Sequence, residues 1–229
     1  MTSTNQQPPA SVERRTMGYD LLRSPFVYSS FQRAVGAGRA YRLFADRCVE
    51  ARSGMSIVDV GAGTGALREL LADCEYTAIE PNSGYVADMR RRFADDPDVT
   101  VVEGTSDALA DIPPGVDRVV FAALTHHLSD EAASRGFELA ARALGPNGRL
   151  VTFDPCIHPS QSSAARFLVG RDRGANVRHP GEYAGLATPY FSRVRLAVTD
   201  GVLRIPYSHA WLVCEGPRRT PPNGIDDRQ

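Results

Sequence analysis

The stretch Val58–Leu70 of the chain reads VDVGAGTGALREL and places glycine at Gly61, Gly63 and Gly65. An apolar run precedes these glycines, and a segment with helical periodicity follows them. Each glycine loses more conformational entropy on folding than any other residue, so such a cluster indicates a turn that needs unusual backbone angles or close approach. The stretch therefore predicts a buried strand, a tight turn and then a helix whose first N–H groups face the turn, an arrangement that suits an anion.

Strand-like and helical patterns alternate from Met55 onward. The last helical pattern ends before Gly145–Gly148, and this Gly-Pro-Asn-Gly run is typical of a helix end and a turn. Such alternation favours a doubly wound, mostly parallel sheet in an α/β fold. Strands are expected at 56–60, 76–79, 99–102, 117–122 and 149–153, and helices over ALRELL, SGYVADMRRRF and DEAASRGFELAARAL. Within the second helix, the run Arg90–Arg92 is interpreted as a solvated face.

Two further strand-like runs near the C-terminus meet at Asp200–Gly201, which is a strong hairpin signal. With the five earlier strands they predict a seven-stranded sheet that ends in an antiparallel hairpin. A parallel sheet that ends in an antiparallel hairpin defines a narrower class of fold than a plain nucleotide-binding sheet.

The region before the sheet is predicted to be helical, because Ala40, Phe44 and Cys48 recur at spacing four. It is rich in aromatic residues, and two interpretations stay open: a helical pair packed on the core, or a lid with one tyrosine over a ligand. The predicted organisation is a disordered tail at 1–15, a helical cap at 16–54, a main domain at 55–215 with a substrate-side insertion at about 156–190, and a disordered tail at 216–229.

Composition excludes several classes of function. The 229 residues carry 26 basic and 27 acidic side chains, so no basic excess favours a nucleic-acid partner. The four cysteines form no C-x-x-C pair, and three lie in apolar segments, which favours reduced core thiols in a cytoplasmic protein. The chain has no apolar run long enough for a membrane span and no apolar signal core at its start.

The spacing within the glycine turn separates the possible ligands. A dinucleotide fingerprint has the pattern G-x-G-x-x-G, and a phosphate loop ends in G-K-[ST], whereas here Gly65 is followed by Ala66-Leu67. Asp59 precedes the turn, and Glu80 closes the second expected strand 21 positions later. A carboxylate at that place can accept hydrogen bonds from both hydroxyls of an unphosphorylated ribose.

Five segments, in this order, resemble the successive motifs of the class I S-adenosylmethionine (SAM)-dependent methyltransferases. They are VDVGAGTGALREL, IEPN, GTSDAL, THHLSD and ALGPNGRLVTF, and they span residues 55 to 155. The later segment DRGANVR…EYAGLA…RIPYSHAWLVC is similar to the tail of small bacterial methyltransferases. The resemblance implies a Rossmann-like methyltransferase fold, SAM as the cofactor and S-adenosylhomocysteine as the product.

The resemblance also implies which residues hold SAM. The glycines would lie against its aminoacyl part, Asp59 near its ammonium group and Glu80 at its ribose hydroxyls, with Pro81 or Asn82 beside the adenine. At the place of the family's acidic adenine contact, either a hydroxyl substitutes or Asp107 is displaced. The whole implied set is Asp59, Gly61, Ala62, Gly63, Gly65, Glu80, Pro81, Thr105, Ser106, Ala122, Leu124 and Tyr28.

Methyl transfer needs alignment of an acceptor lone pair with an activated carbon, and a hydroxyl acceptor also benefits from a general base. His126 in THHLSD is the first candidate for a base or orienting group, with a purely structural role as the alternative, and His127 is expected to be scaffold. Asp154 and His158 follow the fifth strand and are candidates for substrate binding or a second acid–base pair. No ligand spacing supports a metal, so a metal-independent reaction is expected.

The insertion carries Arg166, Arg171, Arg173 and Arg178, interpreted either as a solvated loop or as a clamp for an anionic group of the substrate. Arg171 and Arg173, with Tyr183 and Tyr207, are the candidate substrate-binding residues, and Tyr28 could also shape the pocket.

The function predicted is methylation of an oxygen or nitrogen of a small-molecule acceptor, in natural-product or sugar-related metabolism. The chain would act as a monomer or homodimer, without nucleic acid or membrane. The alternatives are a SAM-fold protein that does not transfer methyl, and a methyltransferase of peptides or proteins. An NAD-dependent oxidoreductase is disfavoured by the glycine spacing.

Overall fold

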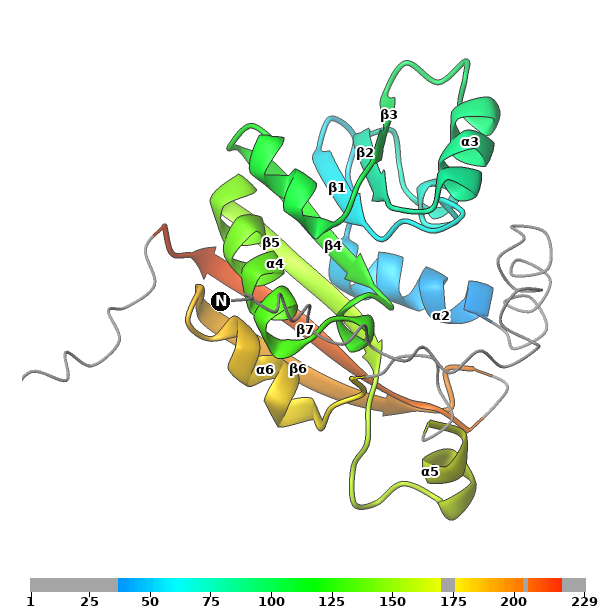
Figure 1. Cartoon of the computed structure of the whole chain (residues 1–229), viewed down its shortest axis with the longest axis vertical. Helices are drawn as coiled ribbons and strands as arrows, with labels where there is room; N and C mark the ends of the chain where they lie inside the picture. Colours follow the sequence, from blue (N-terminus) through cyan, green and yellow to red (C-terminus); the bar gives the residue numbers. More distant parts are fainter. Residues whose placement is uncertain (1–36, 170–175, 204–205, 220–229) are drawn as a thin grey trace, which may run out of the picture.

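A mixed sheet of seven strands runs through the described part of the chain in the order β3-β2-β1-β4-β5-β7-β6 (Figure 1). The structure is a computed structural model, and it describes residues 37–169, 176–203 and 206–219. The first five strands in this order, β3, β2, β1, β4 and β5, pair in parallel, whereas β7 is antiparallel to both β5 and β6. This confirms the predicted fold class. The strands are β1 (Ser56–Val60), β2 (Glu75–Glu80), β3 (Val99–Glu103), β4 (Val116–Ala122), β5 (Leu144–Pro155), β6 (Phe191–Asp200) and β7 (Ser208–Pro217).

The strand order reverses between β1 and β4, which lie side by side although β2 and β3 separate them in the chain. Ligands of open α/β sheets bind beyond the carboxyl ends of the strands at such a reversal. The glycine turn follows β1, and the segment with His126 follows β4. The topology therefore brings these two segments to one edge of the sheet.

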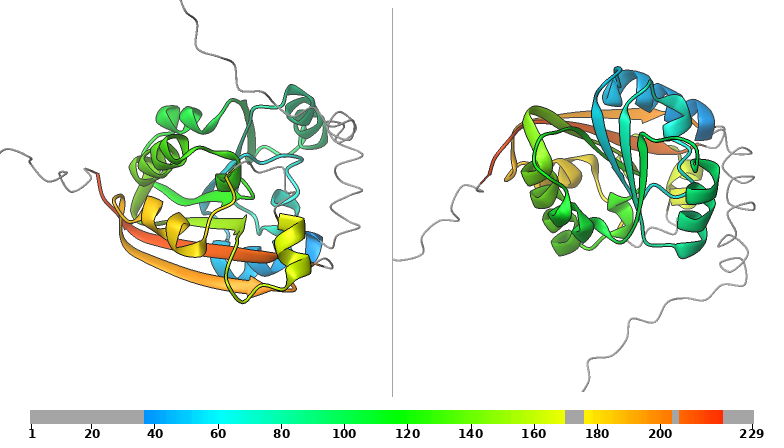
Figure 2. Two further views of the ribbon diagram at one scale, coloured as in Figure 1. Left: turned by 60° about the horizontal axis from the view of Figure 1, so that its bottom comes forward. Right: turned by 90° about the horizontal axis from the view of Figure 1, so that it is seen from above.

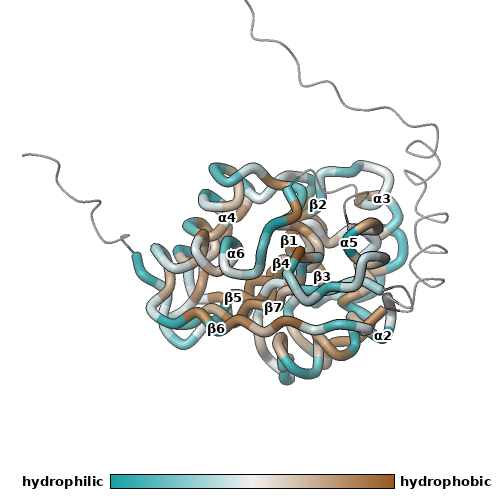
Figure 3. The backbone as a smooth tube through the Cα atoms, turned by 90° about the horizontal axis from the view of Figure 1, so that it is seen from below, coloured by the Kyte–Doolittle hydropathy of each residue, from teal (hydrophilic) through white to brown (hydrophobic). Residues whose placement is uncertain are grey.

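Helices cover both faces of the sheet, as the two views of Figure 2 show. Successive strand residues point to opposite faces, so Val58 belongs to the core beneath α4 and α6, and Ile57 to the core beneath α2. Hydrophobic stretches follow the strands in Figure 3. The helices are α2 (Ala37–Phe44), α3 (Ser83–Arg92), α4 (Asp130–Ala143), α5 (Ser163–Val169) and α6 (Pro180–Ala187).

The predicted helical region before the sheet is described only from residue 37 onward. There α2 continues into a π-helical turn at Ala45–Val49, and its buried face is the one predicted from Ala40, Phe44 and Cys48. The Phe44 ring stacks on Phe153 of β5 at a centroid distance of 5.6 Å. The described part of this region thus packs on the core. Tyr28 lies outside the described residues.

Two segments differ from the prediction. ALRELL forms only a 3₁₀ turn at Arg68–Leu70, because bonds from residue i to i−3 continue out of the glycine turn until the chain reverses toward β2. The expected turn at Gly145–Gly148 is instead a bulge within β5, because Leu144 pairs with Val116 and Arg149 with Arg118, which leaves the four residues between them without a partner in β4. A Cβ on Gly148 would lie 2.6 Å from the Val116 carbonyl oxygen and 3.1 Å from the Gly145 nitrogen, so glycine lets the chain fold back closely at this point.

The C-terminal hairpin is present as predicted, with Asp200 ending β6 and a connection over residues 201–207. Strand β7 continues to Pro217, past the expected domain end at 215. All four cysteines are buried and unbridged. Among the described residues, no helix is long and apolar enough to cross a membrane.

Candidate active site

The glycine turn reverses the chain directly after β1. Gly61, Gly63 and Gly65 have φ angles of 71°, 57° and 71°, which side chains of L-residues rarely adopt. The N–H groups of Gly61 and Ala62 donate to the Ile79 carbonyl of β2 at 2.8 and 3.2 Å. The turn is therefore attached to β2. No α-helix directly follows the turn, so the predicted helix start is wrong, and an anion site at the turn stays a prediction.

The three glycines have different surroundings. A Cβ on Gly61 would lie 3.0 Å from Leu124 Cδ1, and one on Gly65 would lie 2.9 Å from Met89 Sδ and 3.0 Å from Phe93. A Cβ on Gly63 would meet no atom within 4 Å. At Gly61 and Gly65, close packing inside the protein thus adds to the positive φ in favouring glycine. Gly63 alone of the three has open space beside it, where a ligand can lie.

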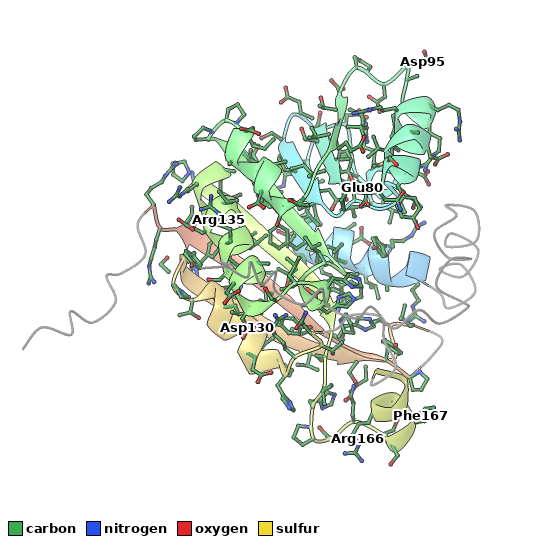
Figure 4. The ribbon with its side chains drawn as sticks, viewed as in Figure 1. Glu80, Asp95, Asp130, Arg135, Arg166 and Phe167 are labelled. Atoms are coloured by element: carbon green, nitrogen blue, oxygen red, sulfur yellow. The ribbon has the colours of Figure 1, made fainter. Side chains whose placement is uncertain are left out.

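Glu80 ends β2 and supports the turn. One carboxylate oxygen accepts from the Gly63 N–H at 2.9 Å, and the other accepts from the Asn82 N–H at 2.9 Å. Glu80 is only 6 % exposed, and this burial raises the pKa of its carboxyl group. The Glu80 carboxylate is therefore buried at the end of β2, where it supports the turn. Glu80 lies among the elements of the fold in Figure 4, whereas Asp95 is at the periphery.

Asp59 lies inside β1 and is 2 % exposed. Its Oδ2 accepts from the Tyr76 hydroxyl at 2.5 Å, whereas Oδ1 has no hydrogen-bond partner among the described residues. Burial raises the pKa of Asp59 to about 7, with a smaller contribution from the charge of Glu80. A buried carboxylate oxygen without a donor can receive a hydrogen bond from a ligand.

Two of the other implied cofactor residues, Asn82 and Thr105, cap helical segments. Asn82 accepts from the N–H groups of Gly84 and Tyr85 and so caps α3, and Thr105 accepts from the N–H of Asp107 and caps a 3₁₀ turn at Ser106–Asp111. The Asp107 side chain is 74 % exposed and lies 4.0 Å from Arg135. Pro81 is exposed, Ser106 is half-buried, Ala122 is buried at the end of β4, and Leu124 covers Gly61.

Ala123 was missed by the sequence analysis. It follows β4 with a φ of 55°, and its N–H donates to the Phe153 carbonyl at 2.7 Å. A residue with a Cβ in this region stores strain of about 1–3 kcal/mol, and such residues cluster at functional sites. No sequence signal could have found it, because alanine gives no indication of a left-handed backbone.

His126 and Asp154 form a buried pair across the ends of β4 and β5. Asp154 Oδ1 lies 2.9 Å from His126 Nδ1 and also accepts from the His126 main-chain N–H at 3.1 Å. The two residues are 4 % and 1 % exposed. Because a carboxylate accepts, the proton sits on Nδ1, and Nε2 is the nitrogen that carries the lone pair of the neutral ring.

The burial of the two adjacent histidines bears on their expected roles. His126 is buried, and His127 is exposed, with the two rings 4.0 Å apart. The expectation that His127 packs as scaffold is therefore wrong, and the histidine proposed to face the substrate is the buried one. His126 can act only within a site that is shielded from water.

His158 belongs to a different cluster. Its Nε2 lies 3.1 Å from Ser208 Oγ and 3.4 Å from Asp200 Oδ1, and its Nδ1 lies 3.1 Å from Ser160 Oγ. Ser208 also donates to Asp200, which with His158 lowers the pKa of the Asp200 carboxyl. Asp154 and His158 therefore do not form a pair with each other. His158 connects the end of β5 to the hairpin.

Two of the candidate substrate residues have structural contacts. Tyr183 is 1 % exposed, and its hydroxyl donates to the Pro155 carbonyl at 3.0 Å and accepts from the Arg178 N–H at 3.3 Å, so it is a core residue and not a substrate contact. Arg178 is buried and donates to Asp130 and to the carbonyls of Thr125 and Leu128, which holds the segment after β4.

The remaining candidates stay predictions. Arg166 points outward from α5 in Figure 4, Tyr207 is half-buried beside His209, and Arg171 and Arg173 lie outside the described residues. Within the described ranges, no group of three His, Cys, Asp or Glu side chains could hold a metal ion.

A family model described as a methyltransferase domain matches residues 57–148. The matched segment runs from β1 into β5 and includes the glycine turn, Glu80 and His126. A search of the curated proteins found no match to the sequence.

Several solved structures share the fold. The pyocyanin biosynthetic protein PhzM matches with a TM-score of 0.64 at 17% identity, over 82% of this chain and 58% of its own. The mitomycin 7-O-methyltransferase MmcR matches with 0.60 at 17% identity, over 83% and 56%. The [4+2]-cyclase SpnF matches with 0.61 at 14% identity, over 80% and 82%. This chain thus spans little more than half the length of the first two.

Proposed function

We propose that this chain, whose residues 57–148 match a methyltransferase-domain model, is a class I SAM-dependent methyltransferase that transfers the methyl group of SAM to a small-molecule acceptor without a metal ion. The observation that carries the proposal is a juxtaposition. The glycine turn follows β1, His126 follows β4, and Asp154 lies near the end of β5, and these are neighbouring parallel strands. Cofactor and acceptor chemistry would therefore meet at one edge of the sheet.

The residues at the turn fit SAM. The open space beside Gly63 admits a ligand, the unpartnered Oδ1 of Asp59 can accept from an ammonium group, and the oxygens of Glu80 retain lone pairs for ribose hydroxyls. When bound, SAM supplies an electrophilic methyl carbon on a sulfonium. The protein would contribute orientation and exclusion of water.

The His126–Asp154 pair supports a hydroxyl acceptor. Nε2 of His126 would take the proton of the hydroxyl as its oxygen forms a bond to the methyl carbon and the carbon–sulfur bond breaks. Asp154 would hold the ring and stabilise the imidazolium that results, because its Oδ1 contacts Nδ1. An amine acceptor would use the same pair only for orientation.

The names of two structural neighbours support the class of acceptor. One is a biosynthetic protein of pyocyanin, and the other is a mitomycin O-methyltransferase. We propose a natural-product acceptor of this kind, and we retain the proposals of a cytoplasmic location, a monomer or homodimer, and the division into a cap and a main domain.

A second candidate is an enzyme that keeps the SAM fold and does not transfer methyl. The match to the cyclase favours it, because that match covers 80% of this chain and 82% of the cyclase, whereas the two neighbours above are much longer than this chain. The two candidates differ in whether S-adenosylhomocysteine accumulates.

The test is a two-step assay on the purified full chain. First, thermal shift with SAM, S-adenosylhomocysteine and NAD should show stabilisation by the first two, since a ligand that binds only the folded state raises its melting temperature. Then SAM and a panel of phenolic and amine acceptors should yield S-adenosylhomocysteine and a methylated product. Stabilisation by NAD alone would contradict SAM as the cofactor of this chain. SAM binding with acceptor turnover but no S-adenosylhomocysteine would favour the second candidate.

A further inference from the structure

The last turn of α3 contacts the glycine turn through Arg92. Arg92 Nη1 donates to the carbonyl oxygen of Thr64 at 2.7 Å, and Thr64 lies between Gly63 and Gly65 in the chain. Arg92 Nη2 donates to Glu69 at 2.5 Å, just beyond the turn. One guanidinium therefore joins the glycine turn to the segment that follows it. This is not the solvated role expected for the whole arginine run.

Apolar contacts accompany the polar ones. A Cβ on Gly65 would collide with Met89 and Phe93, which shows how closely these two side chains approach the turn. The guanidinium carbon of Arg92 lies 4.9 Å from the centre of the Phe93 ring. The end of α3 thus holds Thr64 by a hydrogen bond and Gly65 by packing.

The opposite side of the turn is held by β2. Glu80 accepts from the Gly63 N–H, and the Ile79 carbonyl accepts from the N–H groups of Gly61 and Ala62. The backbone is therefore fixed from two sides, and the open position at Gly63 lies between them. If Arg92 no longer held the Thr64 carbonyl, the peptide next to Gly63 would gain rotational freedom that a bound ligand would have to remove.

We propose that Arg92 is a positioning residue for SAM, which holds the Thr64 peptide so that the turn is arranged before the cofactor binds. The inference rests on the proposed function, because it takes SAM as the ligand of the turn. Arg92 would act through the turn, without touching the cofactor.

The same helix offers matched controls. Arg91 bonds to Asp88 and its side chain is 73 % exposed, and Arg90 donates to the Val101 carbonyl of β3. The Arg92 side chain is 31 % exposed. Arg92 also contacts Asp88, at 3.3 Å, so the Arg91 variant controls for the loss of a partner of Asp88. Removing any one of the three arginines changes the net charge equally, so a difference between Arg92 and Arg91 reports on the contacts of Arg92 with Thr64 and Glu69. Because ion pairs at exposed sites add little stability, the melting temperature should hardly change.

The experiment measures S-adenosylhomocysteine binding to the full chain by calorimetry. Arg92→Met keeps the apolar stem over Phe93 and removes the donors, and it should weaken binding about 5- to 20-fold, as expected for a lost charge-assisted hydrogen bond. Arg91→Met should bind within about twofold of the wild type. Arg92→Lys, which restores a donor, should recover part of the affinity.

The outcomes separate the inference from the function. Failure of the wild type to bind either SAM or S-adenosylhomocysteine would overturn the proposed function and this inference with it. Tight binding by the wild type, with Arg92→Met equal to Arg91→Met, would overturn the inference alone. An equal loss of affinity in Arg92→Met and Arg92→Lys, each with an unchanged melting temperature, would also contradict the inference, because the donor that lysine restores would then have no effect on binding.

Discussion

The half of the sheet with the glycine turn and the half with the His126–Asp154 pair are built differently. Around the turn, Gly63 and Glu80 are 17 positions apart, as are Asp59 and Tyr76, and Arg92 contacts Thr64 over 28 positions. Backbone N–H or carbonyl groups of the turn itself take part in most of these contacts. In the other half the partners are separated by 28 positions for His126 and Asp154, by 50 for His158 and Ser208 and by 53 for Arg178 and Thr125, and most contacts start from a side chain.

This difference shows why one half can be recognised from a motif and the other cannot. A turn made of backbone needs glycine at particular positions, and that requirement is visible in any sequence with the same turn. A side-chain cluster needs only that several residues meet, and their spacing depends on the connections between strands. The cofactor side is thus a local property of the chain, whereas the acceptor side is a property of the assembled sheet.

The largest effect is expected at the acceptor side. His126→Ala should lower kcat by about 10²- to 10³-fold if the hydroxyl mechanism holds, because a positioned base contributes on that scale. The SAM affinity should stay nearly unchanged, since the groups proposed to hold SAM are at Asp59, Gly63 and Glu80, and His126 bonds to Asp154. Steady-state kinetics with a competent acceptor and calorimetry with SAM measure the two quantities.

Two variants accompany this test. Asp154→Asn should also lower kcat, because an amide can favour the wrong ring tautomer, and His127→Ala should have a much smaller effect, because His127 is exposed. Equal turnover in His126→Ala and the wild type would make the pair structural. The two halves would then differ in function as well as in construction.

At the cofactor side, Glu80→Ala should weaken SAM binding by about 10- to 100-fold, since hydrogen bonds to a charged group contribute about 1.5–3 kcal/mol. The loss would have two sources, the ribose contact and the support that Glu80 gives to Gly63. Glu80→Gln, which keeps one carbonyl oxygen, should lose less. Unaltered SAM affinity in Glu80→Ala would remove the ribose assignment.

Within the turn, Gly65→Ala and Gly63→Ala should separate packing from ligand binding. Gly65→Ala should lower the free energy of unfolding by about 1–3 kcal/mol, because its Cβ would collide with Met89 and Phe93. Gly63→Ala should cost less stability and more SAM affinity, since nothing in the protein occupies the space beside it. Chemical denaturation and calorimetry on both variants test this. The reverse ranking would show that Gly63 has a purely structural role.

The smallest effect concerns pH. The pKa of Asp59 is raised from 3.8 to about 7 in the folded chain, so the folded state binds this proton more tightly than the unfolded state does. The stabilisation by this group is complete below about pH 4 and is lost as the pH rises through about 7. Between pH 5.5 and 7 this loss should amount to about 1–2 kcal/mol.

Asp59→Asn should remove that part of the pH dependence, measured as the free energy of unfolding at several pH values. Asp95→Asn is the matched control, because Asp95 is exposed at the periphery (Figure 4). If the Asp59 carboxylate accepts from the ammonium of SAM, the affinity for SAM should rise over the same pH interval. A pH-independent affinity would place the ammonium elsewhere.

Much of the fold could be predicted because the strands are short, apolar and bounded by turn residues. Strand β1 occupies the predicted positions, and the hairpin forms where Asp200–Gly201 indicated it. The prediction failed at ALRELL and at Gly145–Gly148, where local propensity suggests a helix and a turn. At ALRELL the bonds from residue i to i−3 that continue out of the glycine turn decide the conformation, whereas at Gly145–Gly148 the pairing of β5 with β4 decides it.

Within the candidate site, the glycine turn and the acidic residues on either side of it could be read from the amino-acid sequence, because backbone geometry at a turn requires glycine, and SAM as the cofactor followed from the resemblance of the successive motifs to those of a family. The folded chain was needed to show that Gly63 is the open position, that Glu80 is buried against it and that Asp154 pairs with His126 and not with His158. These properties depend on which strands become neighbours. A residue's own neighbours in the chain cannot report that.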